Sequence, residues 1–347
     1  MSRSKAVAAG SAERPRAIAI VGPTATGKTD VATAVARELS GEVISLDSRQ
    51  AYRGFGIGTA APTADEMGAV LHHGVGFLDP MEPYGAGTFA RYAHEWMREI
   101  HARRHIPILA GGTGFFLSAL LRPIFREPPL DPERRADLRH WLDQRSVDEL
   151  REWVGRLDPA LEDRLERVDR QRASRALELA LLTGRSLSDW IADGEPEHEP
   201  LRACCFALAI PAEPHRERIE RRARSLLQSG WVEEVLRLRE AGLDQSPAFN
   251  AVGYRDVLSL ADGEVSEEDA IERIVRATWA YARRQRTWFR HQLPSDAIAL
   301  DALRPTGQLA ERIARDWRAS AGAGGGAQVS RRVSQERQIN RMGVDTE

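Results

Sequence analysis

Gly22-Pro23-Thr24-Ala25-Thr26-Gly27-Lys28-Thr29 (GPTATGKT) is the stretch that decides the fold. It fits the pattern of a P-loop, in which glycines permit a tight turn whose backbone amides point at phosphate oxygens. The apolar run Ala17 to Val21 precedes it, and Thr29 to Leu39 carries apolar residues at helical spacing. A strand, a loop and a helix in this order open a βαβ unit, so we expect a phosphate site between them. There, Lys28 would reach the terminal phosphate and the Thr29 hydroxyl would hold Mg²⁺.

Two further buried strands follow the P-loop, at Glu42 to Leu46 and at Ile106 to Ala110. Strands that alternate with helices predict a mainly parallel sheet, whose ligands bind beyond the carboxyl ends of its strands. Asp47 comes directly after the first of these strands, and Thr113 lies in a glycine-rich run after the second. We therefore expect Asp47 and Thr113 to lie close to the P-loop.

The length of the chain predicts more than one compact part, because 347 residues exceed the size at which a single hydrophobic core usually keeps growing. Charged, leucine-punctuated helical sequence interrupts the α/β pattern, which resumes with a strand at Arg202 to Ile210. We predict an α/β fold: a P-loop NTPase-like parallel sheet flanked by helices, with a helical insertion and a helix-rich C-terminal part. The expected divisions are 16–126 and 201–318 for the two parts of the core, 127–200 for the insertion, and 319–347 for a disordered tail. Helical patterns cover Thr88 to Arg104, Glu213 to Ser229, Val232 to Glu240, Gly253 to Ala261 and Glu267 to His291, and a last short strand is expected at Ala297 to Leu300.

The composition argues against a membrane protein. No run approaches the roughly 20 apolar residues that a spanning helix needs, and the start of the chain lacks the apolar core of a signal peptide, so we expect a cytoplasmic protein. The formal net charge is −2, so a nucleic-acid partner has to be argued from local patches. Lysine occurs only at Lys5 and Lys28 among the 49 basic residues, which suggests a role for Lys28 that a planar guanidinium cannot fill. Cys204 and Cys205 are adjacent in an apolar run and are expected to be core residues.

The P-loop indicates a diphosphate or triphosphate ligand but not the reaction, so ATPase, GTPase, kinase and transferase all remain open at this point. A motor-type ATPase should offer an aspartate at the end of a later strand, whereas Ile106 to Ala110 ends in glycines. Asp47 is the best-placed carboxylate, and its position suits a group that acts on an acceptor substrate. The alternative for Asp47 is a turn-forming or helix-capping role before Ser48.

Arginine clusters form a third feature of the sequence. In the last long helix they alternate with aromatic residues, among them Trp279 and Tyr281, which suits phosphate contacts combined with base stacking on looped RNA. Because glutamates lie among the arginines, each cluster taken singly is more often a solvated helix face. The clusters comprise Arg164, Arg167, Arg170, Arg172 and Arg175, then Arg216, Arg218, Arg221, Arg222 and Arg224, and finally Arg283, Arg284, Arg286 and Arg290.

Several blocks of the sequence together resemble the tRNA dimethylallyltransferases, also called isopentenyl-tRNA transferases. The resemblance includes the P-loop and continues through Asp47-Ser48-Arg49-Gln50-Ala51-Tyr52-Arg53 and Ile57-Gly58-Thr59-Ala60. The later blocks, in family order, are His72-His73, Gly111 to Gly114, Asp169-Arg170-Gln171-Arg172 with Arg175-Ala176-Leu177-Glu178, Val252-Gly253-Tyr254, and Tyr281-Ala282-Arg283-Arg284-Gln285 with Thr287-Trp288-Phe289. Together they run from about residue 16 to residue 292 and cover most of the chain.

The resemblance implies transfer of a dimethylallyl group from dimethylallyl diphosphate to the N6 amine of the adenine just 3′ of the tRNA anticodon. The P-loop would then hold the donor diphosphate instead of ATP, with Mg²⁺ as cofactor, and the helical insertion would embrace the anticodon stem-loop. Family positions imply that Asp47 is the general base, that Thr24 orients the diphosphate, and that Lys28 and Arg222 neutralise it. The implied tRNA contacts are Asp47, Ser48, Arg49, Gln50, Thr113, Arg135, Gln171, Arg172, Ala173, Ser174 and Arg175.

The chain departs from the usual family sequence at Ala61, Gly74 to Gly76, Phe116, Val168 and Trp279. These departures concern the acceptor channel and the tRNA affinity, and none removes the P-loop or Asp47. Two alternatives remain: a P-loop kinase in which Asp47 activates a hydroxyl, and a nucleic-acid-binding NTP switch without transfer chemistry. Neither matches the order of the motifs, and the kinase leaves the basic helices without a role. We expect the enzyme to be a monomer.

Overall fold

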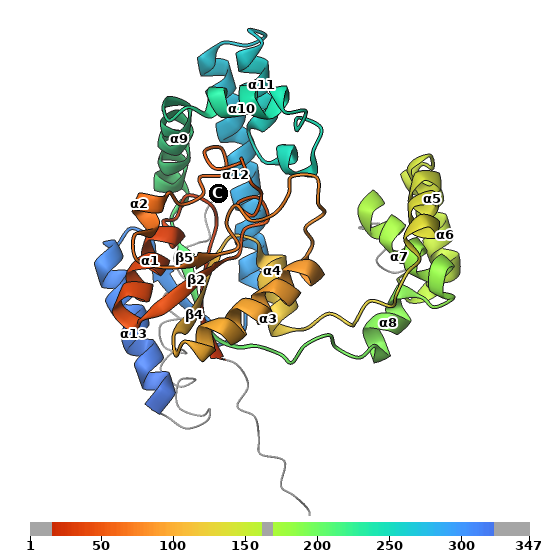
Figure 1. Cartoon of the computed structure of the whole chain (residues 1–347), viewed down its shortest axis with the longest axis horizontal. Helices are drawn as coiled ribbons and strands as arrows, with labels where there is room; N and C mark the ends of the chain where they lie inside the picture. Colours follow the sequence, from red (N-terminus) through yellow and green to blue (C-terminus); the bar gives the residue numbers. More distant parts are fainter. Residues whose placement is uncertain (1–15, 162–168, 323–347) are drawn as a thin grey trace, which may run out of the picture. The chain divides into compact units, whose positions relative to one another are not determined.

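The computed structural model describes residues 16–161 and 169–322, and these divide into two compact units. Unit 1 takes the described residues up to Leu121 and from Pro200 onward, and unit 2 is Arg122–Glu199 (Figure 1). Helix α13 (Thr306–Gly322) runs into the segment expected to be a disordered tail, so the helical chain ends later than expected. The remainder of the expected tail, 323–347, lies outside the described residues, as do Arg164, Arg167 and Val168.

A six-stranded sheet forms the centre of unit 1, and all its pairings are parallel. In chain order the strands are β1 (Arg16–Val21), β2 (Gly41–Ser45), β3 (His72–His73), β4 (Ile106–Gly111), β5 (Arg202–Ala209) and β6 (Ile298–Asp301), and across the sheet they follow the order β3-β2-β4-β1-β5-β6. The central strand β1 is buried along its length after Arg16, as expected for a strand covered on both faces. The parallel sheet predicted from the sequence is confirmed, and only the two-residue strand β3 was not anticipated.

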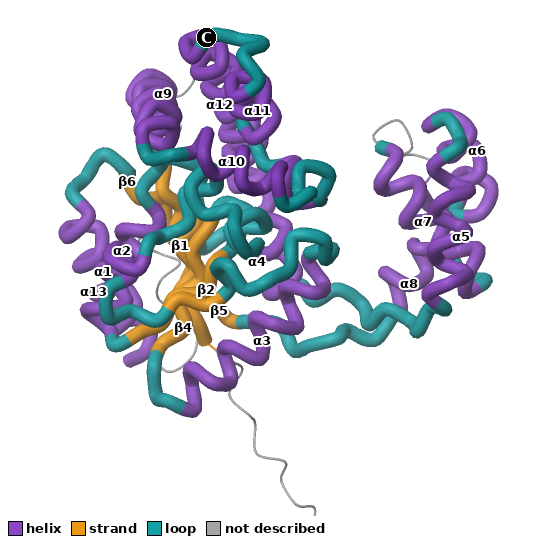
Figure 2. Tube along the Cα trace, turned by 45° about the horizontal axis from the view of Figure 1, so that its top comes forward, coloured by secondary structure: helices purple, strands orange, loops and turns teal. Residues whose placement is uncertain are grey.

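Helices cover both faces of this sheet. Helices α1 (Lys28–Leu39) and α13 pack together on one side, and α3 (Ala86–Ala102) and α4 (Gly114–Leu121) pack together on the other (Figure 2). The sequence analysis missed α4, because its residues are almost all apolar and show no helical period. It also missed α13, although Leu309, Ala310, Ile313, Ala314 and Trp317 are all buried at helical spacing.

A second hydrophobic core in unit 1 packs the segment after β2 against C-terminal helices. These elements are α9 (Ala212–Gln228), α10 (Trp231–Glu240), a 3-10 turn (Pro247–Asn250), α11 (Tyr254–Ala261) and α12 (Glu267–Gln292), close to the predicted ranges. Phe55 lies against Tyr254, with ring centroids 5.3 Å apart, and Tyr254 in turn meets Trp231 at 5.6 Å. This core fixes the chain that follows Asp47, and a short helix, α2 (Ala64–Met67), comes after it.

The described residues of unit 2, 122–161 and 169–199, form four α-helices: α5 (Pro132–Asp143), α6 (Val147–Leu157), α7 (Arg170–Thr183) and α8 (Leu187–Asp193). Each begins at a Ser or Asp whose side chain accepts a hydrogen bond from a backbone amide of the first turn. Leu142, Leu150, Val154, Ala173 and Leu177 form a small core of its own. The helical character expected for this segment is confirmed.

Two further expectations from the sequence concern membrane-spanning helices and the two cysteines. Among the described residues, no helix is long and apolar enough to cross a bilayer. Cys205 is buried and Cys204 is half-buried on β5, and both are free thiols, as expected for core residues.

Glu42 is a buried charged residue in the sheet, and its side chain is only 3% exposed. Its carboxylate accepts hydrogen bonds from Arg103 (Nε and Nη2, both 2.8 Å), His73 (Nε2, 2.7 Å) and His105 (Nδ1, 2.8 Å). Burial alone would raise the pKa of Glu42, but these hydrogen bonds outweigh burial and lower its pKa to about 2.

We predict that Glu42→Gln lowers the free energy of unfolding at pH 7 by about 3 kcal/mol, because it leaves the Arg103 guanidinium at a buried site without its anion. The Glu42 contribution is fully present above the unfolded-state pKa of 4.5 and is lost as the pH falls toward 2, so the wild type should lose more stability than the variant across this range. Urea unfolding at several pH values measures both effects. Glu38→Gln, which removes a partly exposed ion pair with Arg318, is the matched control and should cost less than about 1 kcal/mol. Equal losses for the two variants would contradict the prediction.

Candidate active site

The P-loop joins β1 to α1 and has the backbone that the sequence predicts. Gly27 adopts φ 81° as the residue before α1, and no side chain caps that helix start, so its first amides face the loop. Gly22 approaches Leu208 so closely that a Cβ atom would lie 2.7 Å from the Leu208 carbonyl oxygen. The Thr26 hydroxyl and the Lys28 ammonium both donate to the Pro23 carbonyl, at 2.9 and 2.7 Å. The loop therefore presents backbone amides and the positive end of α1 to an anion.

Two half-buried basic side chains, Lys28 and Arg222, and the carboxylate of Asp47 share this end of the sheet. Burial, and after it the charge of Arg222, lowers the pKa of Lys28 to about 7, while Asp47 acts in the opposite direction. Burial also lowers the pKa of Arg222 on α9, and Asp47 again opposes the shift. The positive charge of Arg222 thus disfavours protonation of Lys28 in a poorly solvated place, and a bound polyanion would offset this effect.

Asp47 makes the turn after β2, as the alternative interpretation of the sequence proposed. Its Oδ1 accepts from the Arg49 amide at 2.8 Å and from the Gln50 amide at 3.3 Å. Within the described part of the chain no donor reaches the other carboxylate oxygen, Oδ2. The turn role and a role toward a substrate are therefore compatible, because they use different oxygens.

Thr113 lies beside this turn, as expected. Its amide donates to the Leu46 carbonyl at 3.0 Å, and its hydroxyl accepts from the Ser48 amide at 3.3 Å. The side chain of Tyr281 on α12 interacts with the Thr113 hydroxyl. Burial and the nearby charge of Asp47 raise the pKa of Tyr281 to about 12, so its phenol stays protonated at neutral pH and can donate a hydrogen bond.

Gln285 on α12 connects the P-loop to the glycine-rich loop that carries Thr113. Its Oε1 accepts from the Thr24 amide at 2.8 Å, and its Nε2 donates to the Gly112 carbonyl at 2.9 Å. Glycine is required at Gly112, because a Cβ atom there would lie 2.2 Å from that Nε2. The buried His215 holds the same P-loop residue from α9, since its Nε2 donates to the Thr24 carbonyl at 2.8 Å. Sequence analysis did not assign these positioning roles to Gln285 and His215, because such pairings join residues far apart in the chain.

The loop Ile57-Gly58-Thr59-Ala60 is held by buried Glu234 on α10. The Ile57 and Gly58 amides donate to its carboxylate at 2.6 and 3.0 Å, and the Tyr254 hydroxyl donates at 2.7 Å. A Cβ at Gly58 would lie 2.1 Å from Trp231 Nε1, which explains the glycine. The Gln50 side chain donates to the Ala60 carbonyl at 3.0 Å, so this predicted tRNA contact also has an internal structural role.

A cavity of about 320 Å³ opens among these elements. Its polar lining includes Thr24, Asp47 and Arg222, and its apolar lining includes Trp231 and Ile274. Pockets of this size with a few convergent charged groups and an apolar wall suit a small ligand that has an anionic and a hydrocarbon part. The remaining lining residues are Ser48, Arg49, Gly58, Thr59, Ile219, Ala223, Leu226, Asn250, Ala251, Val252, Thr278, Tyr281 and Arg284.

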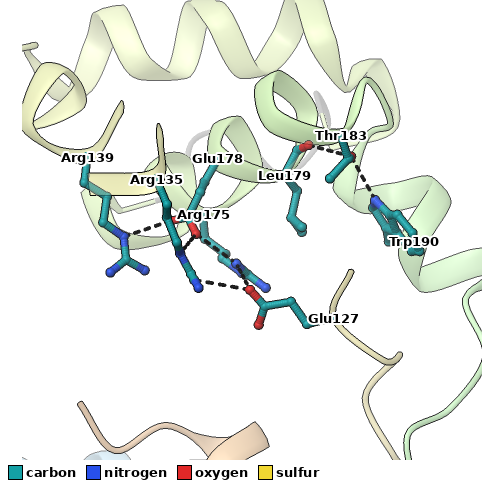
Figure 3. Close-up of polar contacts among 8 residues, drawn as sticks. All are labelled: Glu127, Arg135, Arg139, Arg175, Glu178, Leu179, Thr183 and Trp190. Atoms are coloured by element: carbon teal, nitrogen blue, oxygen red, sulfur yellow. Dashed lines mark hydrogen bonds and ion pairs between the residues drawn. The ribbon is translucent and has the colours of Figure 1, made fainter. Parts of the chain in front are cut away.

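The other predicted RNA contacts lie in unit 2. Gln171 and Arg172 are exposed in the first turn of α7, and Ser174 and Arg175 are half-buried. Ala173 is fully buried, so its methyl group packs in the core of the unit. Arg135 and Arg175 take part in a network of ion pairs with Glu127 and Glu178 (Figure 3).

Trp279, one of the departures from the usual family sequence, lies between two guanidinium groups. Arg216 and Arg286 approach its ring at 5.0 and 4.7 Å from the centroid. The ring of His215 lies 5.5 Å away at an angle of 66°. Trp279 thus packs beside the His215 side chain that holds the P-loop.

Comparisons with known proteins agree with one another. The family described as IPP transferase matches residues 50–292, and the family described as isopentenyl transferase matches residues 15–72. The chain is 37% identical over 311 residues to a tRNA dimethylallyltransferase of Methylococcus capsulatus, which covers 89% of this chain and 98% of the relative. It is 38% identical to one of Thermomicrobium roseum, over 90% of this chain and 94% of the relative.

Solved structures give the same result. The fold is similar to that of the tRNA isopentenylpyrophosphate transferase from Bacillus halodurans, with a TM-score of 0.64 and 29% identity over 93% of this chain and all of that one. It is also similar to a eukaryotic dimethylallyltransferase described as acting on tRNA, with a TM-score of 0.71 and 26% identity over 83% of this chain and 74% of that one.

We predict that Gln285→Ala lowers the free energy of unfolding by about 2 to 3 kcal/mol, because the buried Thr24 amide and Gly112 carbonyl both lose their partner. Activity should fall as well, since Thr24 and Thr113 lie on the two loops that the amide connects. Chemical denaturation and steady-state kinetics measure these effects. Thr287→Ala, at an exposed position on the same helix, is the control. If Gln285→Ala behaved like this control in both assays, Gln285 would have no positioning role.

Proposed function

This chain belongs to the IPP transferase family, and we propose that it transfers a dimethylallyl group from dimethylallyl diphosphate to the N6 amine of the adenine 3′-adjacent to the anticodon in tRNAs. The relatives named above cover nearly the whole chain at 37 to 38% identity. The observation that carries the proposal in the structure is the cavity in which Thr24, Asp47 and Arg222 meet an apolar wall. A kinase would need ATP in this place, and the family does not support that alternative.

The transfer forms a bond between N6 of adenine and C1 of the dimethylallyl group and breaks the bond from C1 to the diphosphate oxygen. The adenine amine is a poor nucleophile, so a base that takes its proton assists the attack. Oδ2 of Asp47 is available for that proton, while Oδ1 keeps the turn in place. The Thr113 hydroxyl and the phenol of Tyr281 lie beside this carboxylate and would orient the base that has left its stack.

The departing diphosphate concentrates negative charge, which the cations of the site offset. Lys28 and Arg222 would neutralise it, the P-loop amides would bind its oxygens, and Thr24 would orient it. Mg²⁺ fits the donor set, because this ion usually takes one or two protein oxygens together with phosphate oxygens, and Thr29 at the start of α1 offers a hydroxyl. When bound, Mg²⁺ would supply further charge neutralisation to the diphosphate.

Arg49, Ser48 and Gln50 beside Asp47, and the arginines of unit 2, are the proposed contacts to the anticodon stem-loop. Guanidinium groups suit the RNA backbone, because they offer several donors to phosphate oxygens. We propose that the enzyme acts as a monomer. We place its activity in the cytoplasm together with its tRNA substrate.

We predict that Asp47→Asn reduces the rate of transfer about 10²- to 10⁴-fold, because an amide cannot accept the N6 proton. Asparagine keeps an oxygen for the Arg49 and Gln50 amides, so the fold and tRNA affinity should change little. The assay incubates protein, Mg²⁺, dimethylallyl diphosphate and unmodified tRNA and then weighs the digested nucleosides. Dimethylallyladenosine should form with the wild type and nearly disappear with the variant. The absence of any prenylated nucleoside with the wild type would refute the proposed function.

We predict that Arg222→Met lowers kcat/KM for dimethylallyl diphosphate about 10²- to 10³-fold, as expected for the loss of a donor in the cavity to a charged transition state. Binding of inorganic diphosphate should weaken in parallel, which isothermal calorimetry can measure. Arg221→Met changes the neighbouring, exposed arginine of the same helix and serves as the control. Equal effects of the two substitutions would show that only the overall charge of α9 matters.

A further inference from the structure

Three arginines of unit 2 gather around two glutamates. Arg135 and Arg139 lie one turn apart on α5, and Arg175 lies on α7. We call these three residues the arginine clamp. All three contact Glu178 of α7: Arg135 and Arg139 through Nε, the latter at 3.0 Å, and Arg175 through Nη1 at 3.2 Å (Figure 3).

The second glutamate, Glu127, comes from the segment before α5. A single oxygen of its carboxylate, Oε1, forms an ion pair with Arg135 Nη2 at 3.2 Å and accepts a hydrogen bond from Arg175 Nη1 at 3.0 Å. One anionic oxygen between two guanidinium groups is also the arrangement in which a phosphate oxygen binds to paired arginines.

The two glutamates differ in burial. Glu178 is only 3% exposed, whereas the side chain of Glu127 is 39% exposed. If Glu178 moved away from the arginines, its buried carboxylate would lose its partners, which is costly. The Glu127 side chain is partly exposed and can turn toward water at little cost. Glu178 is therefore a fixed part of the clamp, and Glu127 is a replaceable one.

The clamp carries an excess of positive charge, with three guanidinium groups against two carboxylates. Arg139 is 52% exposed, and only its Nε contacts Glu178, so its terminal nitrogens face away from the carboxylate (Figure 3). Without Glu178, Arg135 and Arg139 would repel each other across one helical turn. Glu178 therefore holds like charges together, and their remaining donors point outward.

We propose that Glu127 occupies the position of an RNA phosphate between Arg135 and Arg175, and that the anticodon stem-loop must displace it to bind. Glu178 is a positioning residue that keeps the three guanidinium groups in place during this exchange. The proposal rests on the proposed function, because it takes the RNA of that reaction as the ligand. Glu127 then acts as a specificity determinant. A ligand that offers only an isolated phosphate does not displace the Glu127 carboxylate, whereas an RNA that makes further contacts with the protein does.

Glu127→Gln tests the exchange directly. The amide keeps the shape but loses the charge that competes with phosphate, so the affinity for an unmodified anticodon stem-loop RNA should rise about three- to fivefold. Fluorescence anisotropy measures this affinity, and KM for tRNA should fall to a similar extent with kcat unchanged. The gain should shrink as the salt concentration rises from about 0.05 to 0.5 M, because the competing contacts are screened.

Glu152→Gln is the matched control. Glu152 lies in the same unit and pairs with Arg156 on the exposed side of α6 at 2.6 Å, so this variant makes the same change in net charge away from the clamp. Its affinity for RNA should stay within about twofold of the wild type. An equal gain in both variants would mean that net charge, and not displacement of Glu127, sets the affinity.

Glu178→Gln tests the positioning role. The variant should raise KM for tRNA about tenfold or more and leave kcat at saturating tRNA unchanged, since the cavity of unit 1 is not altered. Circular dichroism checks that unit 2 remains helical. A fall in kcat with KM unchanged would contradict the positioning role.

The inference and the proposed function can fail separately. If the wild type forms dimethylallyladenosine but Glu127→Gln binds RNA no more tightly than the wild type, the displacement of Glu127 is refuted and the enzyme activity stands. If the wild type forms no prenylated nucleoside yet Glu127→Gln alone tightens RNA binding, the clamp stands and the proposed reaction falls.

Discussion

The amide of Gln285 is the contact on which the candidate site most depends. Two loops that arise at the carboxyl ends of neighbouring strands, β1 and β4, carry Thr24 and Thr113, and nothing in a parallel sheet fixes such loops to each other. One side chain from α12 bonds to both, through Thr24 and Gly112. Because both bonds join backbone groups and one of them is fully buried, they hold the loops in one arrangement before any substrate binds, which is the condition for effective electrostatic stabilisation.

The arrangement of the charges that surround these loops lowers the stability of the folded protein. Desolvation lowers the pKa of both Lys28 and Arg222, the charge of Arg222 lowers the pKa of Lys28 further, and Asp47 compensates only in part. Without a bound anion, the presence of Lys28 and Arg222 in one poorly solvated place is unfavourable, since like charges there repel strongly. In the proposed reaction, a diphosphate that binds there would recover this energy, which would add to the affinity for the donor and for the charge that develops as it leaves.

The sequence predicted the parallel sheet, the P-loop and the neighbourhood of Asp47 and Thr113, because each of these follows from a local pattern and from the rule that parallel strands end at one edge. It did not predict the roles of Gln285, His215 and Glu234. These residues act through hydrogen bonds to backbone groups more than 170 positions away in the chain, and no local pattern encodes such pairs. The missed helix α4 has a different cause: a short run that is apolar on all sides has no period to read. Asp47 shows that two interpretations of one residue need not exclude each other, since its two oxygens serve different partners.

The two units both carry basic residues, but these residues differ in their solvation and in their pairing with carboxylates. In unit 1 the basic groups of Lys28 and Arg222 are poorly solvated and only partly compensated by Asp47, which suits a small and highly charged diphosphate that fills a cavity. In unit 2 the arginines are partly exposed and paired with carboxylates, which suits a long polyanion that must be gripped and then released. A clamp of uncompensated arginines would hold any RNA backbone, because phosphate contacts carry no sequence information. Carboxylates between the arginines weaken every such contact equally, so an RNA that also reaches the cavity of unit 1 gains more than one that binds the clamp alone. Discrimination between RNAs then arises from the free energy needed to displace the carboxylate from the clamp, since the correct substrate alone can offset it.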